Sequence, residues 1–266
     1  AQLAADWRQI RSTMGLTPSA PTLAVISMAH SYGFSNLVLP LLLGGMPVIA
    51  LPDPLPATLR RGLGLGCAVT LPAVPAMWRA WHAADALEGA RIACAITAGA
   101  PMPLELESAL FESTGLKVHN FYGSSECGGI AYDDTDHPRA SAEEAGRPMD
   151  GVSLEVGSDG CLRVRSAAVA EAYDPPGAEL LGGVFHTSDL ARIESGRVHL
   201  LGRQTDTIHV AGRKVSPQVI ESALLRHHGV RHCVVFGVTS ADPARVEEIV
   251  ACVTADECIS DSALQQ

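Results

Sequence analysis

Short apolar runs alternate with longer amphipathic stretches over the first 120 residues. The runs are rich in Val, Ile, Leu and Ala and are predicted to be strands buried on both faces: Leu23–Ile26, Pro47–Leu51, Cys67–Leu71, Ala93–Ile96 and Val118–Phe121. The stretches between them have the length and periodicity of helices: Ala4–Met14, Phe34–Leu43, Val74–Ala84 and Leu104–Thr114. This alternation predicts the α/β class, with mostly parallel sheets layered against helices. Ligands on such sheets bind outside the carboxyl ends of the strands.

The pattern changes after about residue 145. Short alternating strands separated by Gly, Ser, Asp and Pro are typical of a small antiparallel sheet or barrel, and they are predicted at Val152–Val156, Cys161–Val164, Gly183–His186 and Val198–Leu201. A following α+β unit is predicted from a helix and two strands at Pro217–His228, Cys233–Val238 and Ile249–Val253. We therefore expect residues 1–145 to be the α/β part of a large domain, 146–203 to be its β-barrel subdomain, and 204–266 to begin an incomplete C-terminal domain.

Composition and charge exclude several classes of function. Of the 266 residues, 47% are hydrophobic and 18% are charged, which is enough apolar surface for a folded core. The formal net charge is −10 without any Lys/Arg cluster, so nucleic acid is not an expected partner. No apolar run approaches the roughly 20 residues of a membrane span. The seven cysteines contain no Cys-x-x-Cys pair, which argues against zinc and predicts buried free thiols in a cytoplasmic protein.

A glycine-rich segment, Arg61–Gly66, superficially suggests a dinucleotide-binding loop. Such a loop lies between a strand and a following helix. Here the order is reversed, because the apolar strand Cys67–Leu71 comes after the glycines. The segment is therefore predicted to connect a helix to a strand, and a Rossmann-type oxidoreductase is disfavoured.

The segment Val118–Gly129, with the sequence VHNFYGSSECGG, carries the most informative chemistry. A buried strand leads into an aromatic residue, a glycine, two hydroxyls and a carboxylate, and two more glycines follow. The aromatic ring offers a stacking face for a base, and the glycines permit a close approach of the backbone. The hydroxyls can donate to phosphate oxygens, and the carboxylate can hold magnesium. A polar turn at the end of a strand is the alternative interpretation.

Two later segments are unremarkable when each is taken alone. Phe185–Leu190 places one Asp after a β-run, and Gly202–Pro217 leads into the predicted C-terminal helix. Together with Phe121–Glu126, and in this order, they resemble the motifs of the adenylate-forming superfamily. That superfamily includes acyl-CoA synthetases, the adenylation domains of peptide synthetases, and luciferases. The resemblance extends upstream to Ala98–Pro101 and Ser27–Gly33, so it covers nearly the whole chain.

The resemblance implies an AMP-forming acid–thiol ligase. In that family a carboxylate and ATP give an acyl-adenylate and pyrophosphate, and a thiol then takes the acyl group as a thioester. The implied cofactors are ATP or AMP, Mg²⁺, and a thiol that belongs either to CoA or to phosphopantetheine. The implied partners are a small carboxylic acid and CoA or an acyl carrier protein, with no nucleic acid and no membrane.

The resemblance also assigns roles to individual residues. The adenine slot would be formed by residues that follow two strands, with the last of them stacked on the base: Gly99, Ala100, Pro101, Asn120, Phe121 and Tyr122. Gly123 would let the backbone approach the nucleotide. Ser125 would contact the α-phosphate, and Glu126 would bind magnesium as a catalytic carboxylate. Asp189 would hold the ribose hydroxyls together with Arg203.

His30 falls where family members with simple acyl or aryl substrates often have a His near the substrate carboxylate. No Asp lies within Ser27–Asn36 to pair with an amino group, so a carboxylic acid without an amino group is favoured. An amino-acid-activating adenylation domain is the alternative for the substrate. A histidine at a strand end that is satisfied by the backbone is the alternative for His30 itself.

The chain departs from the family pattern in three places. A phosphate loop would precede Ala1 and a catalytic lysine would follow Gln266, so we expect a partial chain that binds adenylate weakly and does not turn over. Thr205 stands at the hinge position, where Asp or Lys is usual, and Ser188 replaces a common Gly. A catalytically incomplete nucleotide- or acyl-binding module is the alternative function. The open sheet edge of a partial chain would also favour a homodimer.

Overall fold

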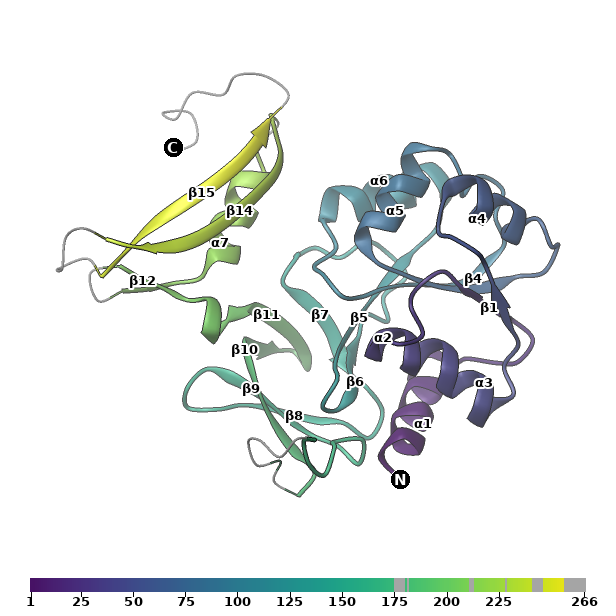
Figure 1. Cartoon of the computed structure of the whole chain (residues 1–266), viewed down its shortest axis with the longest axis horizontal. Coiled ribbons are helices and arrows are strands. Elements are labelled where there is room, and N and C mark those ends of the chain that lie inside the picture. Colours follow the sequence, from purple (N-terminus) through teal and green to yellow (C-terminus); the bar gives the residue numbers. More distant parts are fainter. Residues whose placement is uncertain (175–179, 181, 211–212, 228, 241–245, 256–266) are drawn as a thin grey trace. The chain divides into compact units, whose positions relative to one another are not determined.

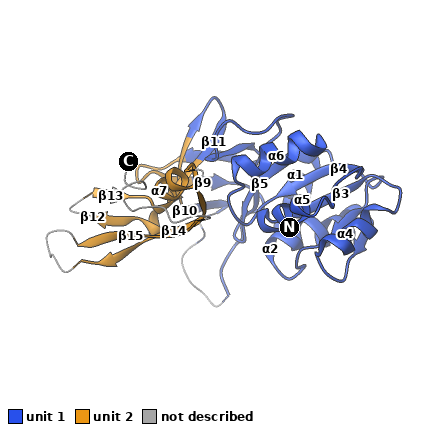
Figure 2. Cartoon of the chain, turned by 90° about the horizontal axis from the view of Figure 1, so that it is seen from above, with its two compact units in different colours: residues 1–155, 163–186, 193–199 blue, residues 156–162, 187–192, 200–266 orange. Residues whose placement is uncertain are grey.

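The computed structural model describes residues 1–174, 180, 182–210, 213–227, 229–240 and 246–255, without the side chains of Thr205 and Lys214. The predicted hinge side chain, Thr205, and one of the seven cysteines, Cys258, therefore lie outside the described part. The chain divides into two compact units (Figure 2). Unit 1 comprises residues 1–155, 163–186 and 193–199, and unit 2 comprises residues 156–162, 187–192 and 200–266.

Five parallel strands form the first part of the sheet in unit 1 (Figure 1). They follow the spatial order β2-β1-β3-β4-β5, and every neighbouring pair is parallel. Their bounds are β1 Thr22–Ala24, β2 Val48–Ala50, β3 Val69–Ala73, β4 Ile92–Thr97 and β5 Val118–Ser124. The predicted α/β class is thereby confirmed. The expectation of burial on both faces holds for β1 and β3. It does not hold for β2, which lies at the edge of the sheet, and β4 and β5 are also partly exposed.

Helices connect these parallel strands, as crossover connections require, and one further helix precedes the first strand. Their bounds are α1 Gln2–Met14, α2 Ser31–Gly33, α3 Leu39–Gly44, α4 Pro56–Leu63, α5 Pro75–Ala83 and α6 Leu104–Thr114. The predicted single helix Phe34–Leu43 is instead a π-helical segment, Phe34–Val38, followed by α3. Pro40 explains the change, because it has no N–H to donate to the carbonyl four residues earlier. The glycine-rich segment connects α4 to β3, as predicted.

The core of unit 1 lies between the parallel strands and α4, α5 and α6. Two tryptophans of α5 are its largest fully buried side chains, although aromatic residues make up only 5% of the chain. Trp78 and Trp81 meet edge to face with ring centroids 5.2 Å apart. Each indole N–H has a backbone acceptor, at Ile96 and Pro54 respectively, so the two rings bury no unpaired donor.

Six more strands extend the sheet beyond β5. The neighbouring pairs β5–β6, β6–β7 and β7–β11 are antiparallel. The full order is β2-β1-β3-β4-β5-β6-β7-β11-β10-β9-β8. The added strands are β6 Gly128–Tyr132, β7 Glu144–Pro148, β8 Ser153–Val156, β9 Cys161–Arg165, β10 Val184–Glu194 and β11 Arg197–Arg203. The strands predicted for a β-barrel thus continue the large sheet, and the described residues form no closed barrel. The physical reason is that β7 pairs with both β6 and β11, which joins the two regions.

Unit 2 contains the remaining small elements. They are a 3₁₀ turn Gln204–Asp206, β12 Ile208–Val210, β13 Arg213–Val215, α7 Pro217–Leu225, β14 Val230–Thr239 and β15 Glu247–Ala255. β12 pairs antiparallel with β13, and β14 pairs antiparallel with β15. Helix α7 packs against β14, and Val235 of that strand is buried. The ends of the helix and of the last two strands lie within three residues of the predicted ends.

Six of the cysteines fall in the described part, and all six are free thiols. Only Cys127 and Cys161 are buried, so the expectation of mostly buried thiols is too broad. Burial raises the pKa of Cys127 to about 12, and partial burial raises that of Cys94 to about 11, which keeps both thiols protonated near neutral pH. In the described part of the chain, no helix has the length and hydropathy needed to cross a membrane.

Candidate active site

The candidate residues of unit 1 gather where parallel strands end. β1, β4 and β5 are parallel members of one sheet, so their carboxyl ends share one edge. His30 follows β1, the loop Gly99–Pro101 follows β4, and Ser125 and Glu126 follow β5. This is the edge at which ligands of open α/β sheets bind. All three residues of the loop after β4 are exposed.

The motif Phe121–Gly129 folds as a β-hairpin rather than as a strand followed by a loop. β5 continues through Ser124, residues 125–127 form the turn, and Gly128 begins β6. Ser124 pairs with Gly128, whose φ is +68°. A three-residue hairpin turn that closes on a left-handed residue is a common design, and glycine adopts that conformation at little cost.

Asp6 of α1 lies directly against this hairpin. Its Oδ1 accepts the backbone N–H of Gly129 at 2.9 Å, and its Oδ2 accepts the hydroxyl of Ser35 at 2.6 Å. A Cβ atom at Gly128 would lie only 2.1 Å from Asp6 Oδ1. Gly128 is therefore required both for its backbone conformation and for the close approach of the carboxylate.

We expect Gly128→Ala to destabilise unit 1 by more than the backbone conformation alone explains. The left-handed conformation costs a residue with a Cβ about 1–2 kcal/mol, and the displaced Asp6 adds to that cost. Gly115→Ala is the matched control, because Gly115 has φ +69° and no atom within 4 Å of the added Cβ. The two free energies of unfolding, measured in urea, should differ by at least 1 kcal/mol on this reasoning. Equal losses would contradict the close approach of Asp6.

Ser125 and His30 each form a hydrogen bond with a residue of helix α2. The exposed Ser125 donates its hydroxyl to Ser31 Oγ at 3.1 Å, which joins the hairpin turn to the start of the helix. The exposed His30 is the N-terminal cap of α2, and its Nδ1 accepts the backbone N–H of Tyr32 at 3.3 Å. The backbone thus uses one ring nitrogen, as the alternative interpretation of this histidine proposed. The exposed ring leaves the predicted substrate role untested.

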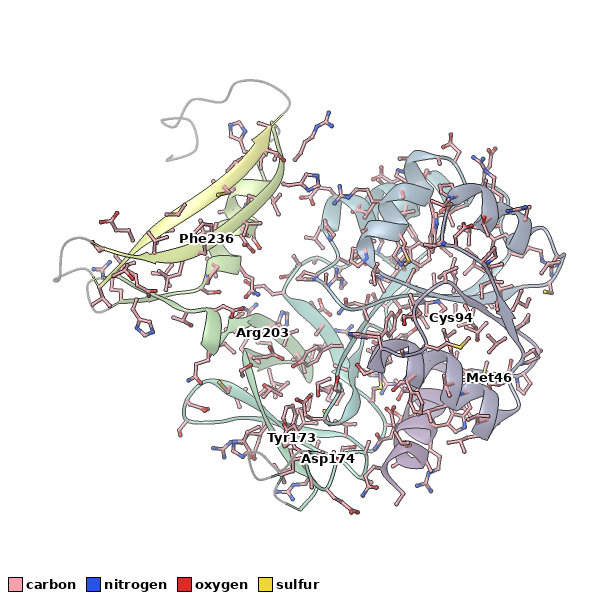
Figure 3. All side chains as sticks on the ribbon, in the orientation of Figure 1. Met46, Cys94, Tyr173, Asp174, Arg203 and Phe236 are labelled. Atoms are coloured by element: carbon pink, nitrogen blue, oxygen red, sulfur yellow. The ribbon has the colours of Figure 1, made fainter. Side chains whose placement is uncertain are left out.

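Glu126 occupies the middle of the turn and is half-buried. Its Oε1 accepts the phenol of Tyr173 at 3.4 Å, and its backbone carbonyl accepts the N–H of Ala170 at 2.8 Å. Partial burial and the nearby Glu126 carboxylate raise the pKa of the Tyr173 phenol, which therefore stays a donor at neutral pH. Tyr173 is labelled in Figure 3.

The predicted adenine residues of β5 do not share one face of the strand. Phe121 is buried and lies against Tyr32, with ring centroids 5.8 Å apart. Asn120 and Tyr122 alternate with Phe121 along the strand and therefore point to the opposite face. The Asn120 amide donates to the carbonyl of Ala145 at 3.5 Å. Gly123 is exposed and follows these residues.

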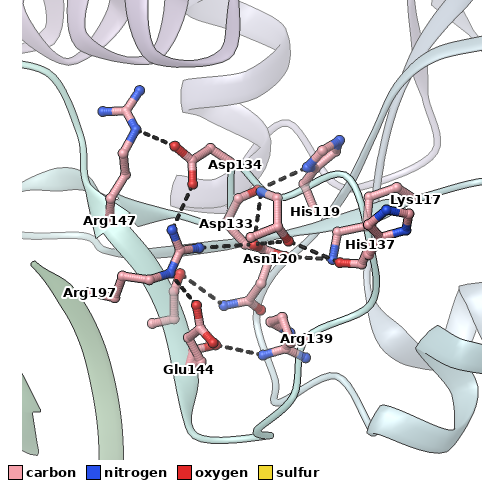
Figure 4. A network of polar contacts seen from close by, with 12 residues as sticks. Lys117, His119, Asn120, Asp133, Asp134, His137, Arg139, Glu144, Arg147 and Arg197 are labelled. Atoms are coloured by element: carbon pink, nitrogen blue, oxygen red, sulfur yellow. Dashed lines mark hydrogen bonds and ion pairs between the residues drawn. The ribbon is translucent and has the colours of Figure 1, made fainter. Parts of the chain in front are cut away.

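A network of charged side chains supports the other ends of β5 and β6 (Figure 4). Lys117 Nζ contacts Glu107 Oε1 at 2.5 Å and Asp133 Oδ2 at 2.6 Å. Arg139 contacts the second oxygen of Glu107 at 2.9 Å, and Arg197 contacts Asp133 at 3.2 Å. Glu107, Asp133 and Arg139 are all buried. Opposite charges therefore compensate one another where water is largely excluded.

Asp189 and Arg203 belong to unit 2 and are paired with each other. Arg203 Nε donates to Asp189 Oδ1 at 3.2 Å. The buried Thr187 hydroxyl accepts the backbone N–H of Asp189 at 3.0 Å and donates to the carbonyl of Leu162 at 3.0 Å. The sequence placed Asp189 after a β-run, but β10 continues through it to Glu194. The correction follows from the pairing of this strand in the large sheet, which a short apolar run does not reveal.

Glu126 is the candidate magnesium ligand. Within the described residues, Tyr173 is the only side chain that donates a hydrogen bond to it, and no group of three or more His, Cys, Asp or Glu residues could hold a metal ion. Magnesium commonly binds one or two carboxylates, with water and substrate phosphates completing its ligands. A single half-buried carboxylate beside the Ser125 hydroxyl fits that mode of binding.

Sequence reasoning missed three residues that shape this site. Asp6 and Tyr173 reach the hairpin from positions far away in the sequence, and Ser31 meets Ser125 across 94 positions. Asp6 carries a weak signal, because it is an acidic residue on the buried face of an amphipathic helix. Ser31 lies in the segment Ser27–Gly33 that contributes to the family resemblance, but that segment does not indicate its contact with Ser125. Tyr173 has no comparable signal in the sequence.

Comparison with known proteins gives one family match. The family model described as AMP-binding enzyme matches residues 1–173. A probable 2-succinylbenzoate–CoA ligase of Mycobacterium tuberculosis is 35% identical over 179 residues, which are 64% of this chain and 42% of that protein. An anthranilate–CoA ligase of Pseudomonas aeruginosa is 28% identical over 224 residues, which are 77% of this chain and 42% of that protein. The chain thus spans less than half the length of these relatives.

Solved structures show the same fold. An o-succinylbenzoate CoA synthetase from Bacillus subtilis, in complex with its acyl-adenylate intermediate, matches with a TM-score of 0.86 at 22% identity, over 99% of this chain and 57% of that one. An ATP-bound protein named MatB from Rhodopseudomonas palustris matches with a TM-score of 0.85 at 24% identity, over 99% of this chain and 56% of that one.

Proposed function

The chain belongs to the AMP-binding enzyme family, and on that premise we propose that it is part of an ATP-dependent acid–thiol ligase. The complete protein would join a carboxylic acid to the α-phosphate of ATP, releasing pyrophosphate. It would then transfer the acyl group from the adenylate to a thiol. The single observation that carries the proposal is the hairpin β5–β6, which presents Ser125 and Glu126 at the carboxyl edge of the parallel strands.

The substrate we propose is a carboxylic acid without an α-amino group, and the thiol we propose is that of CoA. The relatives support this choice, because they include ligases named for 2-succinylbenzoate and for long-chain fatty acids, each with CoA. A carrier-protein thiol is the second candidate, because a relative from Bacillus anthracis is named for an aryl-carrier protein. The absence of Asp between Ser27 and Asn36 agrees with an acid that brings no amino group.

We assign the phosphate-binding work in unit 1 to the hairpin turn. Bound magnesium would neutralise charge on the phosphates of ATP, and Glu126 would hold it there. Ser125 would donate its hydroxyl to an α-phosphate oxygen, which requires only that the hydroxyl turn from Ser31. The glycine at 123 would let the nucleotide approach the strand, and Tyr122 would offer a stacking face to adenine beside the loop Gly99–Pro101.

His30 receives the substrate role in this proposal. Its Nδ1 is used by the cap of α2, so the opposite ring nitrogen, Nε2, is the atom that would donate to a substrate carboxylate. The cap fixes the orientation of the ring, because it ties the imidazole to the first turn of α2. A cytoplasmic location is also proposed, since the described cysteines are free thiols.

Acid-dependent exchange of labelled pyrophosphate into ATP tests the function directly. The complete protein that contains this chain would be assayed with 2-succinylbenzoate, benzoates and fatty acids, and with amino acids as the comparison class. We expect exchange with at least one acid that lacks an amino group. Exchange with amino acids alone would overturn the substrate class. Binding of AMP without any exchange would favour a nucleotide-binding module instead.

Within unit 2, we propose that Asp189 accepts hydrogen bonds from the two ribose hydroxyls. Asp189→Ala should weaken ATP binding by about 2–4 kcal/mol, the scale for removing a partly buried charged acceptor. Calorimetric titration with ATP would measure the change. Asp159→Ala is the control, because Asp159 is an exposed carboxylate of the same unit. A change below threefold for Asp189→Ala would place the ribose elsewhere.

A further inference from the structure

We propose that Asp6 is a positioning residue for the hairpin that carries Ser125 and Glu126. Its carboxylate would fix the turn of the hairpin relative to helix α2, and it would act on the reaction only through these two residues. The inference rests on the proposed function for its kinetic test, and a second test below does not depend on that function.

Both oxygens of Asp6 are used, and they are used by two different parts of the site. One accepts the N–H of Gly129, four residues after Ser125, and the other accepts the hydroxyl of Ser35, four residues after Ser31. Ser125 and Ser31 contact each other through their hydroxyls. The hairpin and the segment that begins with α2 meet at this hydroxyl pair, and Asp6 contacts the same two segments through its two oxygens.

The pairing of β5 with β6 is irregular near Gly129, and Asp6 accepts the hydrogen bond of the Gly129 N–H there. The register between β5 and β6 shifts between Tyr122 and Gly123, which pairs with Gly129. A side-chain acceptor at the shift holds the N–H of Gly129 at a point where the ladder is irregular. Losing that acceptor would leave a buried donor unpaired next to the catalytic turn.

Asp6 is an expensive residue to bury in this way. Only 3% of its surface is exposed, and within the described part of the chain it forms no ion pair. Burial raises its pKa, while the hydrogen bonds from Ser35 and Gly129 lower it in part. An apolar side chain would avoid this desolvation cost, but it would accept neither hydrogen bond. The arrangement exchanges some stability for a fixed position of the turn.

Asp6→Ala and Asp6→Asn separate a positioning role from a purely structural one. Asn keeps an acceptor for Gly129 but loses the charge and the acceptor for the Ser35 hydroxyl, whereas Ala removes both acceptors. In the complete protein we expect Asp6→Ala to lower kcat of pyrophosphate exchange about 100-fold, the scale for a displacement of about 1 Å in an active site. Asp6→Asn should recover at least a tenth of the lost activity, and it should restore the dependence of the rate on Mg²⁺ concentration.

Gln9→Ala is the matched control. Gln9 is a buried polar residue one turn further along α1, and its amide bonds to Ser166 and Gly151 rather than to the hairpin. This variant should lose stability while keeping kcat per folded molecule within about threefold of the wild type, because the hairpin keeps its anchor. A drop in kcat equal to that of Asp6→Ala would show that any loosening of α1 has the same effect, which would overturn the inference.

Hydrogen exchange measured by mass spectrometry provides the test that needs no activity. Asp6→Ala should lose protection in peptides that cover residues 125–131 while the peptides of β3 and β4 stay protected. Unchanged protection of the hairpin, or an equal loss throughout unit 1, would overturn the positioning role. If the wild-type protein exchanges no pyrophosphate with any acid, the proposed function fails, and this measurement still decides the role of Asp6.

Discussion

Glu126→Gln is expected to lower the rate of adenylate formation by about 10²–10³-fold, the scale for losing one preorganised electrostatic contact at developing charge. The substitution removes the charge that would hold magnesium but changes the side-chain volume little. Gln keeps an oxygen that can accept the Tyr173 phenol, so the hairpin should keep its shape. Pyrophosphate exchange at saturating ATP and acid, with Mg²⁺ varied, would measure the effect.

Glu171→Gln is the control for this loss of charge. Glu171 is exposed, lies two residues before Tyr173, and accepts a hydrogen bond from Gln2 rather than from the site. The rate of pyrophosphate exchange by the Glu171→Gln variant should stay within about twofold of the wild-type rate, as for most surface substitutions. If Glu126→Gln exchanged pyrophosphate at a near wild-type rate, the assignment of the hairpin as the magnesium site would be refuted.

Glu107→Gln should have the largest effect on stability, a loss of about 3–5 kcal/mol in the free energy of unfolding. Glu107 of α6 is 1% exposed, and its two oxygens contact Lys117 and Arg139. Without its charge, Lys117 keeps only Asp133 as a partner, and the Arg139 guanidinium loses its carboxylate. Removing one member of a buried ion network leaves uncompensated charge in a poorly hydrated place. Urea denaturation followed by fluorescence of the buried tryptophans would measure the loss.

Glu105→Gln, on the same helix, is the matched control, because Glu105 is exposed. It should change the unfolding free energy by no more than about 0.5 kcal/mol. A triple replacement of Glu107, Lys117 and Arg139 by Leu or Met should be less harmful than Glu107→Gln alone, since Asp133, which loses Lys117, keeps its ion pair with Arg197. A loss below 1 kcal/mol for Glu107→Gln would show that water reaches this network.

The parallel half of the fold could be predicted because its strands are continuous apolar runs. The predicted strand Ala93–Ile96 and the helix Leu104–Thr114 lie where β4 and α6 are found. The antiparallel half was harder, because β6 and β7 are short and contain glycine, and their stability comes from partners that are distant in the sequence. β10 is longer than its apolar run for the same reason.

The chemistry of the site could be predicted further than its geometry. The motif around Glu126 contributed to the family resemblance, which the match over residues 1–173 confirms, while the roles of its individual residues stay predictions. Local spacing did not show that Gly128 closes a hairpin turn, that Asp6 lies against it, or that Phe121 turns into the core. These features depend on tertiary contacts of α1 and α2, which residue spacing does not encode.

The anchoring of the hairpin on α1 has a consequence for synthesis of the chain. Asp6 and Gly129 are 123 positions apart, and Gln9 and Ser166 are 157 apart. A ribosome that adds roughly 5–20 residues per second needs about 6–25 s to make the stretch between Asp6 and Gly129. During that time Asp6, which is buried in the finished protein, has no hairpin to contact. Helix α1 thus gains its contact with the hairpin only after this stretch has been made, and a chaperone that shields the helix during translation should raise the yield of folded protein.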